Sequence, residues 1–496
     1  MSDGAAPAEA RKFSLHYLRG AAALCVLFYH ASFHLSRLRG DPGPLAIFGP
    51  FFGGFGVAAF FALSGYLMAQ VVERDEPARF LVARMARIYP PFLFVVALFW
   101  ALFALLGEAR GVNLPALSLI PSGPRGYFLT VEWTLLYEMT YYVALAATGF
   151  LGLARWREWL VGVWAAAILL AYASGASPPN DPPLTLGAMA LSVVNLPFAL
   201  GYLSAGALRR GLAPPLLWLP AAGFAAASFL APDSWFRLLV GLAAAFLVAA
   251  LARAPDIRPR AALAAPGGRL GDASYALYLV HAPMIALVDA AAPAATPAKF
   301  VWFAYVATSL ALSLALGPLD VASHRRIKRG LDAARRRTVA TLAFAYLALF
   351  ASVALVAEVG DRGRRAALTR ATSLAVTGAA APLSGGTRAG FETVEKRADG
   401  SWAVAAYGVD LDHPSLGAHF AILDQGRVVD IAQARRFRPE VARALGREDL
   451  ARRRIGFWLG APAGARCAGE RLEARLILAD GRVFRVPDAP LAALCR

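Results

Sequence analysis

The feature that most constrains this chain is a series of long apolar runs. A helix that spans the hydrocarbon core of a bilayer needs about 20 consecutive apolar residues. Eleven candidate runs lie at residues 17–35, 48–72, 88–107, 127–150, 159–174, 187–208, 214–231, 235–252, 273–291, 300–320 and 338–358. Helices satisfy all their backbone hydrogen bonds within the segment, as lipid requires. The sequence therefore predicts an all-α polytopic membrane helix bundle of about 11 spans.

The basic residues between the runs predict the orientation of this bundle. Cytoplasmic loops of membrane proteins carry an excess of Lys and Arg. If the N-terminus is cytoplasmic, 21 basic residues flank the spans on the cytoplasmic side and 6 on the other side. Residues 1–12 are polar and lack a small-residue cleavage site, so we expect the first run to be retained as a span. We predict a multi-pass protein with its N-terminus inside.

This one-sided distribution of basic residues helps to interpret the formal net charge of +17. A strongly basic chain can bind nucleic acid. Here, most basic residues of the membrane region lie on one side of the predicted bundle, and no nucleic-acid-binding motif accompanies them. We therefore expect the lipid bilayer as a partner and no nucleic acid.

The residues after the eleventh run have the pattern of a small all-β domain. Short strands are predicted at residues 402–409, 419–423, 427–431, 455–459, 472–479 and 483–486. The turns at 424–426 and 480–481 contain residues that tolerate positive φ, as hairpin turns require. Residues 362–388 lack a sustained period and are interpreted as a linker. An odd number of spans places this sandwich-like domain outside the cytoplasm.

These patterns divide the chain into three parts. Residues 1–325 hold a membrane domain of 10 spans, residues 326–389 hold a basic cytoplasmic loop, the eleventh span and the linker, and residues 390–496 hold the extracytoplasmic β-domain. Cys467 and Cys495 fall in the last part, where a disulfide is chemically permitted. Two free thiols are the alternative.

Several ionisable residues lie inside the apolar runs, where a charge is costly and is by default a functional candidate. Arg19 and His30 are eleven residues apart in the first run. At about 100° and 1.5 Å per residue they share one helix face, about 16 Å apart along the axis. Glu138 lies among aromatic residues in the fourth run, and His281 lies in the ninth. Their structural alternatives are an arginine that reaches lipid phosphates, satisfied core histidines and a buried ion pair.

Two further short motifs also allow either a functional or a structural interpretation. Arg84 and Arg87 share a helix face at the expected cytoplasmic end of the third run. Arginine binds phosphate with a planar fork of donors, so the pair is either a phosphate clamp or a positive-inside anchor. The Ser64-Gly65 pair in the second run is either part of a site or a notch for close helix packing.

Taken together, these pieces resemble the acyltransferase-3 family of bacterial membrane O-acyltransferases, from about residue 13 to residue 320. Five motifs occur in the family's order: Arg-x10-His at 19–30, the aromatic Ser-Gly span at 60–65, Arg-x-x-Arg-Ile-Tyr-Pro at 84–90, Trp-Thr-Leu-x-Tyr-Glu at 133–138 and Ser-Tyr-x-x-Tyr-Leu-x-His-x-Pro at 274–283. Five ordered matches are far more specific than any one of them.

The resemblance implies ten core spans that take an acyl group, commonly acetyl, from cytoplasmic acyl-CoA. The group is delivered to a hydroxyl of a cell-envelope or exported carbohydrate. His30 would be the general base or a transient acyl carrier, because an unperturbed histidine pKa suits proton transfer. Arg19 would hold the CoA end or polarise the thioester. Glu138 and His281 would orient a histidine or receive the acceptor proton.

The same resemblance implies where the two substrates bind. Ser64, Arg84 and Arg87 would contact acyl-CoA, acetyl-CoA being the expected donor substrate. Trp133 and Tyr142 would contact the carbohydrate acceptor. No metal and no permanently bound cofactor are expected. The family's members place this chain in the bacterial cytoplasmic (inner) membrane.

Two other classes of protein share parts of this pattern. A membrane transporter or flippase for a glycan or lipid-linked substrate would also carry buried His, Arg and Glu, but it predicts repeats between halves. No clear internal repetition of the motifs is seen. A binding protein with a membrane anchor would not need eleven spans with intramembrane charges.

The C-terminal part departs from the minimal pattern of the family. The Gly-Asp-Ser start and Asp-x-x-His end of an appended Ser-hydrolase-like domain are not found in residues 360–496. Residues from 390 onward look instead like a small β-domain attached to some bacterial glycan-modifying enzymes. This domain is either a structural cap or an acceptor-binding domain that uses aromatic residues such as Trp402, Tyr407, Phe437 and Trp458.

Overall fold

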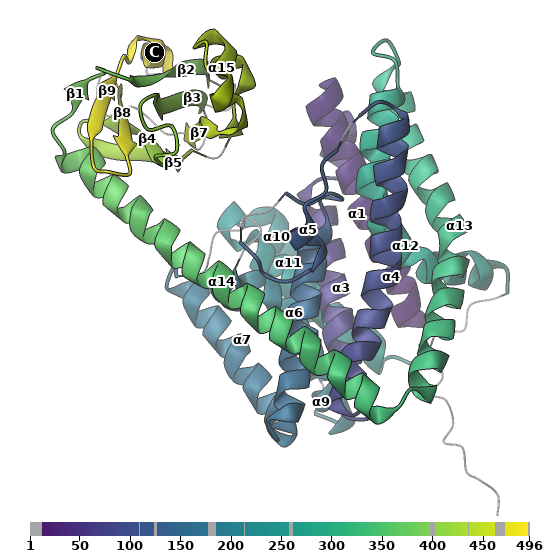
Figure 1. The fold of residues 1–496 in the computed structure, drawn as a ribbon. Coiled ribbons are helices and arrows are strands. Elements are labelled where there is room, and N and C mark those ends of the chain that lie inside the picture. Colours follow the sequence, from purple (N-terminus) through teal and green to yellow (C-terminus); the bar gives the residue numbers. More distant parts are fainter. Residues whose placement is uncertain are drawn as a thin grey trace, which may run out of the picture. The chain divides into compact units, whose positions relative to one another are not determined.

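The computed structural model describes residues 12–108, 110–123, 126–176, 185–212, 214–256, 261–396, 402–434, 436–461 and 472–494. The chain divides into two compact units, with the boundary between Glu358 and Val359. The first unit is helical, and the second is built mainly of β-strands (Figure 1).

An α-helix covers most of each apolar run of the first unit. Its long helices are α1 (Phe13–Arg39), α3 (Pro50–Val71), α4 (Pro77–Leu105), α6 (Glu132–Phe150), α7 (Arg157–Ala173), α9 (Leu196–Arg209), α10 (Trp218–Leu230), α11 (Asp233–Arg253), α12 (Ala261–Ala291), α13 (Ala298–Ala333) and α14 (Arg336–Thr377), the last of which continues into the second unit. Short helices α2 (Gly43–Ile47), α5 (Leu114–Leu117) and α8 (Leu186–Ala190) lie between them.

Six of the described helices are long and apolar enough to cross a membrane, namely α3, α4, α11, α12, α13 and α14. This confirms a mostly helical, multi-pass membrane protein. At 1.5 Å per residue, α9 and α10 are each only about 20 Å long, which is shorter than the roughly 30 Å hydrocarbon core. The total of eleven spans and the orientation of the bundle stay predictions.

Close helix packing in the first unit depends on glycine at the contact between α3 and α9. A Cβ atom at Gly65 would lie 2.0 Å from the Phe198 carbonyl oxygen, and one at Gly201 would lie 2.1 Å from the Ala62 carbonyl oxygen. No side chain fits at either place, so the two backbones approach as small residues allow in membrane bundles. Gly65 is therefore the packing notch that the Ser64-Gly65 pair suggested.

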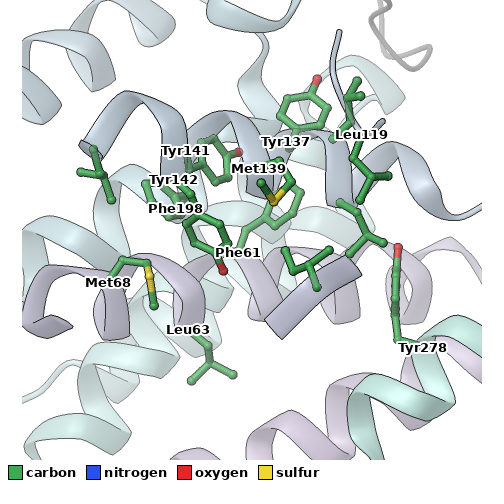
Figure 2. Close-up of a cluster of buried hydrophobic side chains, with 14 of the residues drawn as sticks. Phe61, Leu63, Met68, Leu119, Tyr137, Met139, Tyr141, Tyr142, Phe198 and Tyr278 are labelled. Carbon is green, nitrogen blue, oxygen red and sulfur yellow. The ribbon is translucent and has the colours of Figure 1, made fainter. Parts of the chain in front are cut away.

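An aromatic cluster fills the space beside this contact (Figure 2). Tyr141 on α6 stacks on Phe198 of α9 with ring centroids 3.9 Å apart. Phe61 on α3 contacts the rings of Tyr137 and Tyr141, with both centroid distances 5.8 Å. These aromatic contacts join α3, α6 and α9 into a rigid framework for the polar residues described below.

The second unit is a β-sandwich. One sheet has the strand order β1-β9-β8-β4-β5 and the other the order β2-β3-β7-β6. The strands are β1 (Ala381–Pro382), β2 (Thr387–Lys396), β3 (Trp402–Asp410), β4 (Ala418–Asp424), β5 (Arg427–Gln433), β6 (Arg436–Phe437), β7 (Arg454–Ala461), β8 (Leu472–Leu478) and β9 (Val483–Val486), and a short helix α15 (Pro439–Ala444) follows β6. Phe420 and Phe457 meet in the core between the sheets, with ring centroids 5.4 Å apart.

The prediction of a linker at residues 362–388 was wrong. Helix α14 continues to Thr377, and strand β2 already begins at Thr387. The apolar residues Ala371, Leu374 and Ala375 recur at helical spacing and pack against the sheet through Leu423 and Ile477. The helix is therefore stabilised by tertiary packing that its mixed composition did not reveal.

The turns of the sandwich have the predicted backbone. Gln425 and Gly426 have φ of 47° and 75°, and Gly481 has φ of 98°, the positive values that tight hairpins require. Cys467 and Cys495 lie outside the described residues.

Candidate active site

Two neighbouring cavities in the first unit contain the residues singled out in the sequence. The larger, called the aromatic cavity, has a volume of about 810 Å³, and the smaller, called the arginine cavity, has a volume of about 230 Å³. The side chains that line both are Val57, Phe61 and Tyr278. These three side chains therefore form the partition between the cavities.

The aromatic cavity holds His30. It is also lined by aromatic side chains from α3, α6, α10 and α11, with one arginine among them: Phe51, Phe52, Trp133, Phe229, Phe236 and Arg237. A wide cavity with aromatic walls and few charges offers faces on which an uncharged ring can stack.

His30 forms a hydrogen-bonded pair with His281 on α12. The Nδ1 atom of His30 lies 3.0 Å from Nε2 of His281, and the rings stack with centroids 5.0 Å apart. His281 is buried, and its Nδ1 lies 3.1 Å from the Leu277 carbonyl oxygen. The structure thus brings together two histidines that are 251 positions apart in the chain.

The carbonyl of Leu277 determines how protons are arranged in this pair. A carbonyl oxygen only accepts, so Nδ1 of His281 carries the proton and Nε2 of neutral His281 is an acceptor. Nδ1 of His30 then donates to it, which leaves Nε2 of neutral His30 with a lone pair. The pair can therefore accept a proton at His30 Nε2.

The arginine cavity gathers polar residues from six helices. They are Arg19 of α1, Ser64 of α3, Arg84 and Arg87 of α4, Glu138 and Tyr142 of α6, and His324 of α13, with Tyr275 of α12 beside them. Arg19 and His30 lie on the same helix, but Arg19 lines this cavity and His30 lines the other. The positively charged wall can attract an anionic ligand.

Arg87 is held in place by a carboxylate from α13. Its Nη1 lies 2.8 Å from both carboxylate oxygens of buried Asp320. The guanidinium also lies over the ring of Tyr275, 4.9 Å from its centroid, and the Tyr275 hydroxyl donates to the Ile88 carbonyl. Arg87 is therefore fixed by contacts that a simple lipid-facing anchor would not need.

Glu138 lies in the arginine cavity with two hydroxyl groups. Tyr142 donates a hydrogen bond to Oε1 of Glu138, and Ser64 Oγ lies 3.5 Å from the same oxygen. Tyr142 is therefore in a different cavity from Trp133, although both were expected at the acceptor site. Among the described residues, the histidine that contacts His30 through a hydrogen bond is His281, and no such bond joins His30 to Glu138.

Tyr278 is the best-anchored part of the partition. Its hydroxyl is hydrogen-bonded to Thr134 and donates to the Val131 carbonyl at 2.9 Å. Its ring packs edge-on against Phe60 and lies 5.8 Å from the His281 ring. Tyr278 therefore links the partition to the histidine pair.

Sequence reasoning missed Asp320, His324 and the partition residue Tyr278. Asp320 and His324 are four residues apart and share one face of α13. An acidic residue at the end of an apolar run was a signal for Asp320, but its partner Arg87 is 233 positions away. Tyr278 belongs to a motif that was noticed for His281.

The aromatic residues of the second unit that were expected to bind glycan differ in how far they are buried. Trp402 is buried in the core between the sheets, so its assignment to a binding surface was wrong. Trp458 has 46% of its surface exposed, and the Arg436 guanidinium lies 4.9 Å from its ring. Tyr407 packs partly against the cluster around α15. The side chain of Phe437 lies outside the described residues.

Asp410 is the most constrained charge of the second unit. Its carboxylate accepts hydrogen bonds from the Arg482 guanidinium and from the backbone N–H groups of Asp412 and His413. Burial raises the pKa of the Asp410 carboxyl, but these hydrogen bonds outweigh burial and hold the pKa below its ordinary value. The charge stabilises the loop after β3.

A bundle of apolar helices with a histidine pair beside an aromatic cavity fits a membrane enzyme, and comparison identifies its family. A family model described as an acyltransferase domain matches residues 12–317. The match covers more than half of the chain, so the chain belongs to the acyltransferase-3 family, as its motifs predicted. It is a multi-pass membrane O-acyltransferase.

A relative of known name is the exopolysaccharide production protein ExoZ of Rhizobium meliloti (strain 1021). The two chains are 29% identical over 254 residues, which are 48% of this chain and 78% of ExoZ. No solved structure matches the chain. Asp320, His324 and the whole second unit lie beyond the residues that the family model matches.

Proposed function

We propose that this enzyme moves a short acyl group, acetyl in the simplest case, from acyl-CoA to a hydroxyl of an exported or cell-envelope polysaccharide. The observation that carries this proposal is the His30–His281 pair on the aromatic cavity, one partition away from a cavity lined by arginines. The printed name of ExoZ links that relative to exopolysaccharide production, and this supports a polysaccharide acceptor.

The donor is assigned to the arginine cavity. Acyl-CoA carries phosphates on a long, narrow arm, and Arg84 and Arg87 offer guanidinium donors to such groups. Asp320 engages Nη1 of Arg87, and a guanidinium has five N–H donors in all. The volume of about 230 Å³ suits the arm and a short acyl group.

The acceptor is assigned to the aromatic cavity. Sugar rings present C–H faces that stack on aromatic side chains, and Trp133 and Tyr29 line this cavity together with His30. Its volume of about 810 Å³ is large enough for a sugar residue with its neighbours. A sugar hydroxyl placed there can approach Nε2 of His30.

The transfer proceeds by attack of the acceptor oxygen on the thioester carbonyl carbon. His30 Nε2 takes the hydroxyl proton as the new C–O bond forms. The tetrahedral intermediate then collapses, the C–S bond breaks, and the leaving thiolate receives that proton from His30, which gives the ester and free CoA thiol. His281 orients His30 and holds its Nδ1 proton.

The remaining polar residues act on the donor side. Arg19 lines the arginine cavity on the same helix as His30, so it is suited to polarise the thioester carbonyl or to neutralise the negative charge that develops on it. Glu138 holds Tyr142 and Ser64 in the wall of that cavity. These contacts shape the channel for the arm of the donor.

The predicted topology fits the assignment of the donor and the acceptor to separate cavities. With the N-terminus in the cytoplasm of a bacterial inner membrane, the arginine cavity faces the acyl-CoA pool and the second unit lies outside. Cysteine substitutions at Gly330 and His413, labelled in intact cells, test this topology. We expect label from outside at residue 413 and not at residue 330; equal labelling would contradict it.

The proposed reaction is tested with purified protein, labelled acetyl-CoA and envelope glycans. General-base catalysis is worth about 10² to 10⁴ in rate, so His30→Ala should lower label transfer by that factor. His34→Ala is the matched control, since His34 lies one turn away on α1 and does not line either cavity in the described residues. Unchanged transfer by His30→Ala would refute the assignment.

A further inference from the structure

The arginine cavity contains two buried polar atoms that have no hydrogen-bond partner among the described residues. They are Nε of Arg84 on α4 and Nδ1 of His324 on α13. Both side chains line the cavity. Arg87, which lines the same cavity, differs from these two residues because its guanidinium already donates to Asp320.

Buried polar groups in native proteins are almost always paired, so two unpaired ones on a single cavity call for an explanation. Both atoms are able to donate a hydrogen bond, Arg84 through its guanidinium N–H and His324 through an imidazole N–H. The natural complement is an acceptor-rich, negatively charged group that enters the cavity.

The charges around His324 favour an anion. The charged groups that act on it most are the basic residues Arg84, Arg87 and Lys328 and the acidic residue Asp320. Asp320 is engaged by Arg87, and Glu138, which also lines the cavity, accepts a hydrogen bond from Tyr142. Basic residues therefore outnumber acidic ones around the two unpaired atoms. A phosphate ester supplies the acceptors and the charge in one group.

We propose that His324 of α13 extends the phosphate site of Arg84 and Arg87 into a phosphate-binding subsite, and that Asp320 is a positioning residue that fixes Arg87 in it. This inference rests on the proposed function, since it assigns the bound phosphate to the acyl-CoA donor. Asp320 and His324 of α13 lie beyond the residues that the family model matches.

The subsite is tested by titrating full-length protein in detergent with CoA and, separately, with pantetheine, which lacks every phosphate. Arg84→Ala and His324→Ala should each weaken CoA binding about tenfold, as expected for a charge-assisted hydrogen bond, and should leave pantetheine binding unchanged. His34→Ala is the control histidine. If His324→Ala does not fold, His324→Gln is used instead, and a thermal melt like that of the wild type shows that it is folded.

The results separate the subsite from the proposed function. Unchanged CoA affinity in His324→Ala, or an equal loss of pantetheine affinity, would overturn the subsite while the His30 result stands. No CoA binding by the wild-type chain would overturn the donor itself. If phosphatidylglycerol added to the detergent micelles blocks CoA binding and excess CoA does not displace it, the subsite binds the phosphate of a lipid headgroup. That result would contradict the proposal.

The positioning role of Asp320 has its own readout. Asp320→Asn should raise the KM for acyl-CoA about tenfold and leave kcat within twofold, because the residue acts through Arg87 on binding alone. Its effect should vanish in an Arg87→Lys background, since the two act as one unit. Equal losses in kcat and in thermal stability would show a merely structural contact.

Discussion

The two cavities of the membrane unit differ in size and chemistry. The arginine cavity is small, and its wall carries Arg19, Arg84, Arg87, Glu138 and His324. The aromatic cavity is more than three times larger, and aromatic rings dominate its wall. A charged, narrow site suits the phosphates of a donor, and a wide aromatic site suits a sugar.

His30 lies on one of these two cavities and not on the other. The proposed base lies on the acceptor side, next to the partition of Val57, Phe61 and Tyr278. In the proposed mechanism only the acyl group passes that partition, while the phosphates of the donor and the glycan stay apart. If so, the enzyme binds either substrate without the other.

After the removal of His30 itself, the largest expected effect concerns the orientation of this base. His281→Ala removes the acceptor for the Nδ1 proton of His30, and the loss of one such buried partner costs about 1–3 kcal/mol, or about 5- to 150-fold in rate. We expect kcat to fall by this factor. His281→Asn, which keeps a side-chain acceptor, should restore part of it in the same transfer assay.

A result in which His281→Ala and His281→Asn are equally impaired would show that the ring itself is needed. A fall in CoA affinity in either variant would contradict the assignment of the histidine pair to the acceptor side.

The next effect concerns the donor side alone. Arg87→Lys keeps the charge but loses the planar fork that binds Asp320 and phosphate, so we expect the KM for acyl-CoA to rise about tenfold with little change in kcat. Steady-state kinetics at saturating acceptor measure this. Arg79→Lys on the same helix is the control, because Arg79 donates to the Leu331 carbonyl and does not line the cavity.

A smaller effect concerns the partition. Tyr278→Ala should open a path for water between the cavities, and release of free CoA thiol without acceptor should rise several-fold, because exclusion of water protects reactive thioesters. Tyr278→Phe keeps the ring and is the matched control. If thiol release does not differ between the two variants, Tyr278 does not separate the cavities.

The smallest effect concerns the second unit and depends on pH. The pKa of Asp410 in the folded state is lowered by Arg482 and two backbone N–H groups, so its stabilising contribution is complete above the ordinary Asp pKa of about 3.9 and is lost as pH falls through the folded-state value. Asp410→Asn should destabilise the sandwich by about 1–2 kcal/mol at pH 7.

Hydrogen exchange of the β3 and β4 amides measures this stability. The difference between Asp410→Asn and wild type should narrow as the pH falls below about 4. A difference that does not change with pH would show that the carboxylate charge is not what stabilises the loop.

The sequence was sufficient for the features that depend on local pattern. Apolar runs predicted the helices, and the spacing of Arg19 and His30 predicted that they share α1. Period-2 patterns predicted most strands of the sandwich, but they did not reveal which face is buried. Trp402 and Trp458 therefore looked equivalent, although one lies in the core and the other is exposed.

Features that depend on contacts between distant segments could not be predicted. The Arg87–Asp320 pair joins α4 to α13 across 233 positions, and no local pattern specifies it. The sequence offered both Glu138 and His281 as residues that could orient a histidine, and only the packing of α1 against α12 shows that His281 is the one bonded to His30. The C-terminal half of α14 was missed because its helix depends on packing against β4 and β8.

The most direct test of the two-cavity account is the affinity of His30→Ala for CoA, measured by titration of the full-length protein. The account predicts a Kd within twofold of wild type, even though acyl transfer falls by about 10² to 10⁴, because the base and the donor phosphates occupy different cavities. A loss of CoA affinity that parallels the loss of transfer would contradict it.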